Sequence, residues 1–276
     1  MKPRPFDYVR PDTVEEVLAL LAEYGDDARI LAGGQSLLPM LNLRLVDAAV
    51  LIDISRVVAL DVVCDSDNLI EVGAAVTQNK LMAWPQLKQK LPLVAAALPF
   101  VGHFQTRNRG TVCGSIAHAD PSSELPLVLA VLGGEVVLRS QQRGERVVGV
   151  AEFQKGMLAT AREGDELIAA VRFPVVQRQG VGFREVARRH GDFALIAVAA
   201  VVIGEWVRLG LGGVTGRPIV TPVKAEVARR RPDDWFAEWL EHFEGYDDLH
   251  ATAAMRRDLC KNLVSEVVAE AMSCCA

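Results

Sequence analysis

The pattern of apolar and polar residues predicts an α-helix close to the N-terminus. Apolar side chains recur at helical spacing over residues 14–21. Thr13 and Glu16 have the spacing of a capping box, in which a hydroxyl and a carboxylate satisfy free N–H groups at the start of a helix. Gly25 follows the apolar pattern and suits the end of the helix. We therefore expect a helix that begins near Thr13 and ends near Gly25.

Two short apolar runs after this helix have the composition of buried strands. Residues 29–32 and 50–54 are mostly apolar and are flanked by turn-forming residues. Two consecutive glycines, Gly33 and Gly34, follow the first of these runs directly. The opening of the chain is therefore expected to combine strands and helices around a glycine-rich turn.

After Asp61 the pattern changes to strands that are separated by turns. The sequence predicts strands at residues 69–74, 135–139, 146–150 and 166–173, and apolar helical stretches near residues 92–98 and 124–132. Pro174 closes the last of these strands, and the run 175–180 lacks periodicity and is typical of a linker. We place a domain boundary at this linker.

Beyond the linker, strands are expected first and helices afterwards. Residues 181–188, 193–203 and 206–211 read as three strands, and residues 221–272 carry helical periodicity. The predicted fold class is α+β. Its first domain covers residues 1–175, in lobes of about 1–57 and 58–175, and its smaller second domain covers residues 176–276.

Composition narrows the classes of protein that the chain can belong to. With 276 residues, 50% of them hydrophobic, the chain can bury a sizeable core, which excludes a disordered protein. The net charge of −5 supplies no general attraction to phosphates, so we expect no nucleic-acid partner. The longest purely apolar run, residues 194–203, has about half of the roughly 20 residues that a membrane span needs. We expect no transmembrane segment and, because the N-terminus lacks an apolar targeting region, a cytoplasmic location.

The five cysteines indicate that no metal centre is encoded in this chain. They are Cys64, Cys113, Cys260, Cys274 and Cys275. Their number is odd, they are scattered, and they form no C-x-x-C pair or Cys/His cluster at the spacing of metal ligands. We expect neither an iron-sulfur cluster nor a zinc site, and we interpret the last two cysteines as reduced thiols.

The first candidate binding site is the segment that follows the predicted strand at residues 29–32. It consists of Ala32, Gly33, Gly34, Gln35 and Ser36. Adjacent glycines let a backbone approach a ligand closely, and exposed N–H groups and a serine hydroxyl can donate to phosphate oxygens. The segment therefore suits a pyrophosphate cradle. A simple tight turn after a strand is an equally good interpretation of the glycine pair alone.

The second candidate site is residues 107–121, which we interpret as a long loop rich in glycine and small hydrogen-bond donors. Polar groups inside an apolar chain are costly to bury without partners, and a bound polar cofactor would supply such partners. A surface loop whose polar groups face water is the alternative. Neither this loop nor the run 210–216 is a Rossmann fingerprint, because the latter has Thr215 where the third glycine belongs.

Together, two long motifs resemble one protein family. AGGQSLLPMLNLRL at residues 32–45 and RNRGTVCGSIAHADPSSELP at residues 107–126 closely resemble the FAD-binding medium subunits of the xanthine dehydrogenase/CO dehydrogenase family of molybdenum hydroxylases. Residues 6–18, 166–174 and 183–194 carry further similarity, so that the resemblance covers nearly the whole chain.

The resemblance implies a fold and a set of cofactor-binding residues. The implied fold is a two-lobed FAD domain of the vanillyl-alcohol oxidase (PCMH) type, followed by a smaller α+β domain of antiparallel sheet and helices. By position, the residues implied to contact FAD are Ala32, Gly33, Gly34, Gln35, Ser36, Thr111, Gly114, Ser115, Glu124, Ile168, Arg184 and Phe193. Among them, Glu124 is placed on the adenosine side and Phe193 near the isoalloxazine ring.

The chain departs from the family pattern at Cys113, where relatives usually have a glycine. We interpret this cysteine as a structural residue that packs away from FAD. His118 has Asp120 two residues later but no further partner in its motif, which favours a structural role. Arg188 and Arg189, together with Arg184, suit a partner-docking patch, a cluster that neutralises negative charge on the flavin, or a solvated strand end.

The resemblance also implies a function within a larger enzyme. A large subunit would oxidise the substrate at a molybdenum cofactor, a small subunit would relay electrons through 2Fe–2S clusters, and this chain would pass them from FAD to an external acceptor. The expected assembly is a dimer of such heterotrimers, and the chain would contain no catalytic acid or base. The substrate and the acceptor stay open.

Two alternatives belong to other classes of protein. A freestanding FAD-dependent oxidoreductase would need its own substrate pocket and a proton-transfer residue, and none of the three tyrosines lies in the flavin motifs. A scaffold that has lost FAD is favoured only by Cys113, and the intact AGGQS motif argues against it.

Overall fold

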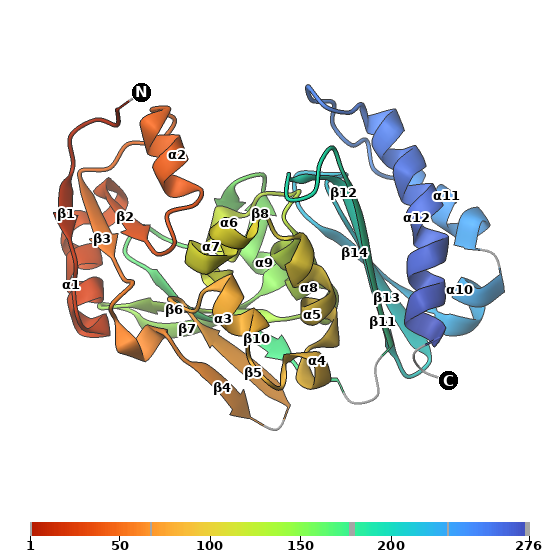
Figure 1. Ribbon diagram of the computed structural model, residues 1–276, viewed down its shortest axis with the longest axis horizontal. Coiled ribbons are helices and arrows are strands. Elements are labelled where there is room, and N and C mark those ends of the chain that lie inside the picture. The colour runs from red at the N-terminus through yellow and green to blue at the C-terminus, as the bar shows by residue number, and fades with distance from the viewer. Residues whose placement is uncertain (1, 67, 177–179, 231, 274–276) are drawn as a thin grey trace.

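The computed structural model describes residues 2–66, 68–176, 180–230 and 232–273. The central part of the predicted linker and the cysteine pair Cys274 and Cys275 lie outside these ranges. In Figure 1 the N-terminal lobe lies at one end, the second lobe in the middle, and the C-terminal sheet and helices at the other end.

The N-terminal lobe is a small parallel sheet with two helices. Its elements are β1 (Asp7–Val9), α1 (Val14–Tyr24), β2 (Ala28–Leu31), α2 (Leu37–Asn42) and β3 (Val50–Asp53), with strand order β1-β3-β2. The predicted first helix is confirmed together with its capping box, because the Thr13 hydroxyl accepts a bond from the Glu16 N–H at 3.2 Å. Val17 and Leu21 of this helix are buried in the core.

The second lobe is built on a five-stranded antiparallel sheet in the order β4-β5-β10-β6-β7. Its strands are β4 (Val63–Ser66), β5 (Leu69–Gly73), β6 (Glu135–Ser140), β7 (Gly144–Gly149) and β10 (Leu167–Pro174). Its helices are α3 (Gln78–Met82), α4 (Leu87–Lys90), α5 (Pro92–Ala97), α6 (Phe104–Arg109), α7 (Val112–His118), α8 (Glu124–Leu132) and α9 (Val150–Phe153). The hairpin of β8 (Gln154–Gly156) and β9 (Ala159–Thr160) completes the lobe.

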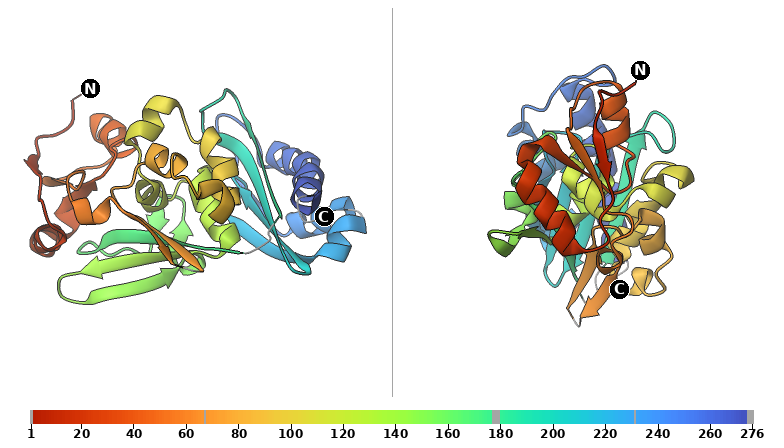
Figure 2. Two further views of the ribbon diagram at one scale, coloured as in Figure 1. Left: turned by 60° about the horizontal axis from the view of Figure 1, so that its bottom comes forward. Right: turned by 90° about the vertical axis from the view of Figure 1, so that its left-hand side faces the viewer.

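The C-terminal part is an antiparallel sheet with helices on one face. The sheet has the order β11 (Gly180–Ala187), β12 (Ala194–Ile203), β13 (Trp206–Gly212) and β14 (Ile219–Lys224). The helices are α10 (Ala225–Arg230), α11 (Pro232–Glu241) and the long α12 (Ala253–Ser273). Helix α12 packs along β11 and β12, as Figures 1 and 2 show.

Helix α8 joins the second lobe to the C-terminal sheet. It is apolar on all sides, as is typical of a helix without a solvent face, and all but one of its residues are buried. It contacts β12 and β13 on one side and α5, α7 and β10 on the other. One hydrophobic cluster therefore runs from α1 through α8 into β11 and β12, and a second lies between the C-terminal sheet and α12.

Two predictions about local structure are wrong. Residues 107–121 are largely helical, because α6 and α7 cover most of them. Val112 and Ile116 supply the buried face of α7, while the opposite face carries small side chains. In the C-terminal part, residues 219–224 form a fourth strand, and no helix covers 242–252 within the described chain. The strand forms there because β13 offers a free edge for pairing with Val220 and Thr221.

The predicted α+β class and the antiparallel C-terminal sheet are confirmed. Among the residues that the structure describes, no helix combines the length and apolar character needed to cross a bilayer.

Two ion pairs in the sheet of the second lobe allow a test of how burial controls the contribution of an ion pair to the free energy of unfolding. Arg146 donates to both oxygens of Glu166, whose side chain is only 1% exposed, at 2.6 and 2.8 Å. Arg146→Met leaves this carboxylate without its main partner, and we expect a loss of about 2 kcal/mol in the free energy of unfolding, measured in urea. Arg139→Met breaks the exposed pair with Glu145 and should cost below about 1 kcal/mol. Equal losses would contradict this reading of Glu166.

Candidate cofactor site

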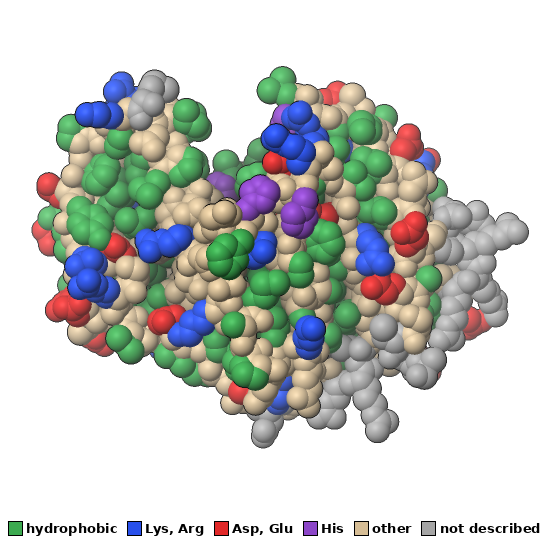
Figure 3. All heavy atoms as spheres, viewed as in Figure 1, with side chains coloured by type: hydrophobic (Ala, Val, Ile, Leu, Met, Phe, Trp, Pro, Cys, Tyr) green, Lys and Arg blue, Asp and Glu red, His purple; other side chains and the backbone are tan. Residues whose placement is uncertain are grey.

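A cavity of about 570 Å³ lies where the two lobes and the C-terminal sheet meet. Its walls come from the segment between β2 and α2, from α7 and the residues before it, and from the β11–β12 turn. Figure 3 shows the molecule hollowed between α2 and the C-terminal part. All of the predicted FAD contacts except Arg184 line this cavity: Ala32, Gly33, Gly34, Gln35, Ser36, Thr111, Gly114, Ser115, Glu124, Ile168 and Phe193.

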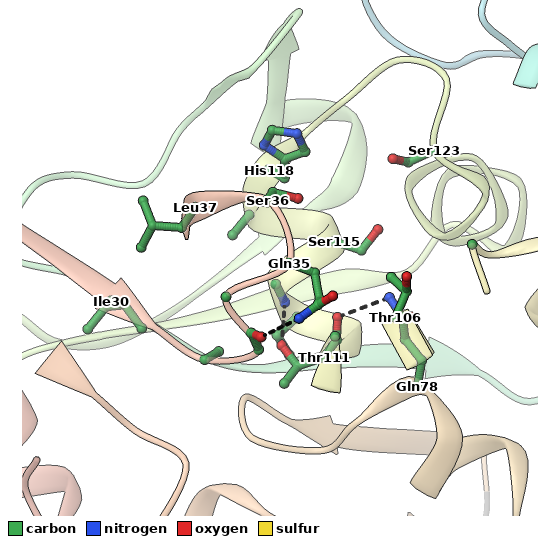
Figure 4. Close-up of a pocket in the computed structure, with 18 of the residues that line it drawn as sticks. Ile30, Gln35, Ser36, Leu37, Gln78, Thr106, Thr111, Ser115, His118 and Ser123 are labelled. Atoms are coloured by element: carbon green, nitrogen blue, oxygen red, sulfur yellow. Dashed lines mark hydrogen bonds between the residues drawn. The ribbon is translucent and has the colours of Figure 1, made fainter. Parts of the chain in front are cut away.

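The first wall is the segment 32–36, which leaves β2 and leads into α2 (Figure 4). The Gln35 side-chain amide donates to the Gly33 carbonyl at 3.2 Å and closes a compact turn. Gly34 has φ of 72°, a left-handed conformation that most residues avoid. Ser36 is the N-cap of α2, but its hydroxyl makes no bond to the helix. The turn thus presents a hydroxyl and backbone groups to the cavity.

The second wall is the segment 111–115, which opens α7. The Thr111 hydroxyl accepts from the Gly114 N–H at 3.0 Å and caps the helix. The two walls touch, because a Cβ at Gly33 would lie 2.2 Å from the Arg109 carbonyl oxygen. Only a residue without a side chain allows this approach. The close contact brings the two segments, which are more than seventy residues apart in the chain, to the same cavity.

The Cys113 side chain is turned toward the core. Its thiol donates to the Val72 carbonyl of β5 at 3.3 Å, and burial raises the pKa of this thiol well above its usual range. The residue is 3% exposed. The thiol is therefore protonated and unreactive in the folded chain, as expected of a structural cysteine.

Glu124 contributes a buried carboxyl group to the cavity. It is the first residue of α8 and is 4% exposed. Burial raises its pKa to about 7; repulsion from Asp120 adds to this effect and Arg107 opposes it. Glu185 lies on the same face of β11 as Phe183, whose ring is 5.4 Å from that of Phe100. Burial and repulsion from Glu124 raise the pKa of Glu185 to about 8.

Arg184, the remaining predicted contact, does not line the cavity. Its guanidinium pairs with Glu270 of α12 at 2.7 Å. Successive side chains of a strand point to opposite faces, and Phe183 occupies the face of β11 that is turned toward the second lobe. Arg184 is consequently directed to the helix side of the C-terminal sheet.

Further residues line the cavity besides the predicted FAD contacts, and Gln78 is one that gave no signal in the sequence. Gln78, the first residue of α3, is 4% exposed, lines the cavity, and has a side-chain oxygen without a hydrogen-bond partner. In the sequence, a glutamine after a capping threonine is typical of an exposed helix start. The burial of Gln78 therefore becomes visible only in the folded structure. His118 also lines the cavity; burial lowers its pKa, and Asp120 at 4.0 Å opposes this shift. Gly191 and Asp192 enter from the β11–β12 turn.

This lining fits a large cofactor with both phosphate and ring groups. Backbone groups and a free serine hydroxyl converge in the 32–36 turn, which suits phosphate oxygens. The unpartnered oxygen of Gln78 requires a donor such as a hydroxyl or N–H. Phe193 is 58% exposed and supplies an apolar surface at the edge of the cavity. FAD carries all of these complementary groups.

Comparison with known proteins assigns the family. The sequence model of the FAD-binding domain in molybdopterin dehydrogenase matches residues 4–176. The chain therefore belongs to this family and is the FAD-binding component of an oxidoreductase.

Relatives of known function match the chain over almost its whole length. It is 38% identical to the caffeine dehydrogenase subunit beta of Pseudomonas sp. strain CBB1, covering 98% of this chain and 96% of that protein. It is 33% identical to the nicotine 6-hydroxylase medium subunit of Paenarthrobacter nicotinovorans, with coverage of 98% and 99%. Among solved structures, a chain of carbon monoxide dehydrogenase from Hydrogenophaga pseudoflava aligns with a TM-score of 0.93, 30% identity and complete coverage of both chains.

We expect the buried Glu124 to make FAD binding sensitive to pH. Its raised pKa of about 7 means that the carboxyl is neutral at pH 6 and ionised at pH 8.5, where it adds negative charge near a diphosphate cofactor. We expect FAD affinity of the apoprotein to fall about tenfold over this interval, measured by quenching of FAD fluorescence. Glu124→Gln should remove most of the dependence, whereas Glu152→Gln, at an exposed position, should not. An unchanged pH profile in Glu124→Gln would exclude Glu124 as the cause.

Proposed function

We propose that this chain is the FAD-binding electron-transfer subunit of a molybdenum hydroxylase complex. The observation that carries the proposal is the cavity between the 32–36 and 111–115 segments, in a chain that matches medium subunits of such enzymes over nearly its whole length. A large molybdenum-cofactor subunit would oxidise the substrate, and a small 2Fe–2S subunit would carry the electrons to this chain. The substrate would contact the large subunit.

We propose that eleven of the residues that line the cavity hold FAD. Gly33, Gly34, Gln35 and Ser36 would enclose the pyrophosphate from one wall, and Thr111, Gly114 and Ser115 from the other; Ala32 and Ile168 would supply further contacts, Glu124 would face the adenosine, and Phe193 the isoalloxazine ring. Their placement around one cavity supports this assignment. Bound FAD would supply the redox chemistry that links the electrons of the small subunit to an external acceptor.

The chain's own residues bind and shield the cofactor rather than move protons. His118 and Asp120 have the residue types of an acid–base pair. Their Nε2 and Oδ2 atoms are, however, 4.0 Å apart, and burial lowers the pKa of the imidazole. A neutral, half-buried histidine suits a hydrogen-bonding role in the wall. Electron transfer through the flavin requires no protein acid or base of this chain.

We also propose the division of the chain and its assembly. The separate sheets favour an FAD domain at residues 1–175, with lobes of about 1–57 and 58–175, and a second domain at 176–276. The relatives include medium subunits and a subunit beta, which supports large and small partners for this chain, and we propose a dimer of such heterotrimers. The described cysteines Cys64, Cys113 and Cys260 are free thiols, the state that the cytoplasm maintains, so we place the complex there.

Gly34 provides a direct test of the pyrophosphate wall. Gly34→Asp adds bulk against the Leu31 and Leu38 side chains and a negative charge on the turn that would hold the phosphates, and we expect no measurable FAD in the purified protein. Gly34→Asn has nearly the same shape without the charge and tolerates the left-handed φ of 72°, so it should retain weakened FAD binding. The flavin content is measured by absorbance after release. Full flavin occupancy in Gly34→Asp would contradict the assignment of the pyrophosphate to this turn.

The assembly is tested by purification of the tagged chain from its native host. We expect a large and a small subunit to co-elute in equal amounts with FAD, iron and molybdenum, and native mass measurement should give two copies of each chain. A yellow protein without metals or partners would instead support a freestanding flavin oxidoreductase. A colourless protein would support a scaffold that has lost the cofactor.

A further inference from the structure

A charged side chain lies in the core of the C-terminal domain, outside the cofactor cavity. Arg256 of α12 is 1% exposed, although a buried guanidinium is costly unless its donors are paired. It donates to the backbone carbonyls of Leu195 and Gly213, the latter at 2.9 Å, and to the Asp248 carboxylate at 2.6 Å. Its guanidinium also lies 4.6 Å from the centre of the Tyr246 ring.

Both carbonyl acceptors belong to segments that border the cofactor cavity. Leu195 is the second residue of β12 and follows Phe193, which lines the cavity, by two positions. Gly213 comes directly after β13, and its N–H donates to the Pro121 carbonyl at 2.8 Å, three residues before Glu124. One guanidinium therefore holds the first residues of β12 against the end of β13, and through Pro121 against the wall of the cavity.

The loop 246–251 provides a second connection to the same region. Asp248 accepts the N–H groups of His250 and Ala251 at 2.8 Å each, and these bonds keep its carboxylate aligned with Arg256. His250 in turn lies 3.1 Å from the guanidinium of Arg188, at the start of the β11–β12 turn. The turn that carries Phe193 is thus held at its beginning by His250 and just beyond its end by Arg256.

We propose that Arg256 is a positioning residue that fixes Phe193 at the mouth of the cavity and thereby sets how easily an external electron acceptor reaches the flavin. The proposal rests on the placement of the isoalloxazine ring beside Phe193 that is proposed above. Phe193 has 58% of its surface exposed, and no aromatic ring pairs with it within the described residues. Its position therefore depends on the backbone that follows it, and Arg256 is the buried group that binds the carbonyl of Leu195, two residues further along.

The geometry favours this role over simple stabilisation of the core. Replacing a buried charge by an apolar residue of similar size is often neutral for stability, so stability alone does not explain the burial of Arg256, whose partner Asp248 is 36% exposed. Two carbonyls on adjacent strands are instead held by one planar group, which fixes their relative position. Lysine keeps the charge at this position but cannot span both carbonyls and the carboxylate in the same way.

A double-mutant cycle on the intact complex tests the proposal. Arg256→Lys, Phe193→Ala and the double variant are compared by anaerobic reduction followed by mixing with ferricyanide, and the rate of flavin reoxidation is recorded from its visible absorbance. We expect each single variant to raise this rate at least about threefold and the double variant to match Phe193→Ala alone, because Arg256 acts through Phe193. Arg257→Lys on the same helix, which binds the Glu244 carbonyl, is the matched control and should leave the rate unchanged.

Each other outcome overturns the proposal. Effects that multiply in the double variant would mean that Arg256 acts independently of Phe193, and a rate change in Arg256→Lys with none in Phe193→Ala would mean the same. If Arg256→Lys does not fold, Asp248→Asn weakens the same guanidinium from its outer side and enters the cycle in its place; no change in that variant overturns the proposal. Absence of flavin from the wild-type complex would instead refute the proposed function.

Discussion

The contact between Gly33 and the Arg109 carbonyl determines how the two lobes can enclose a cofactor. The approach is too close for any Cβ atom, so the segments 32–36 and 111–115 share one boundary. A side chain at this point would push the N-terminal lobe away from α7 and open the cavity along its length. The relative position of the two segments that line the cavity follows from this contact.

The second constraint is the burial of α8 between the sheets. This helix has no polar face, so the C-terminal sheet must cover one of its sides. That covering brings the β11–β12 turn to the cavity and places Glu185 close enough to Glu124 for the two carboxyl groups to repel each other. The C-terminal part is therefore required for a complete cavity, even though most lining residues precede it in the chain.

Much of the architecture could be predicted from local patterns, and the failures have physical causes. The capping box of α1 and the apolar runs of β3, β10 and β12 are signals within a few residues, and they were sufficient. Helix α7 was mistaken for a loop because Gly114 and Ser115 are poor indicators of a helix, and its buried face is only Val112, Cys113 and Ile116. The burial of Gln78 and Arg256 could not be predicted, because it depends on segments that are distant in sequence. The pairing of Arg184 with Glu270 could not be predicted either, because position in a motif does not show the face of a strand.

Each of the two hydrophobic cores contains one buried thiol, and alkylation of these thiols can report local unfolding of each core. Cys113 lies in the core of the second lobe and Cys260 in the core behind the C-terminal sheet, and burial raises the pKa of both, that of Cys260 to about 12. Neither sulfur can be alkylated until the surrounding core separates. Peptide mapping after a timed exposure to an alkylating reagent therefore reports which of the two cores opens first, with the exposed Cys64 as an internal standard for reagent activity. Alkylation of Cys113 thus reports the opening of the second lobe, and alkylation of Cys260 that of the C-terminal part.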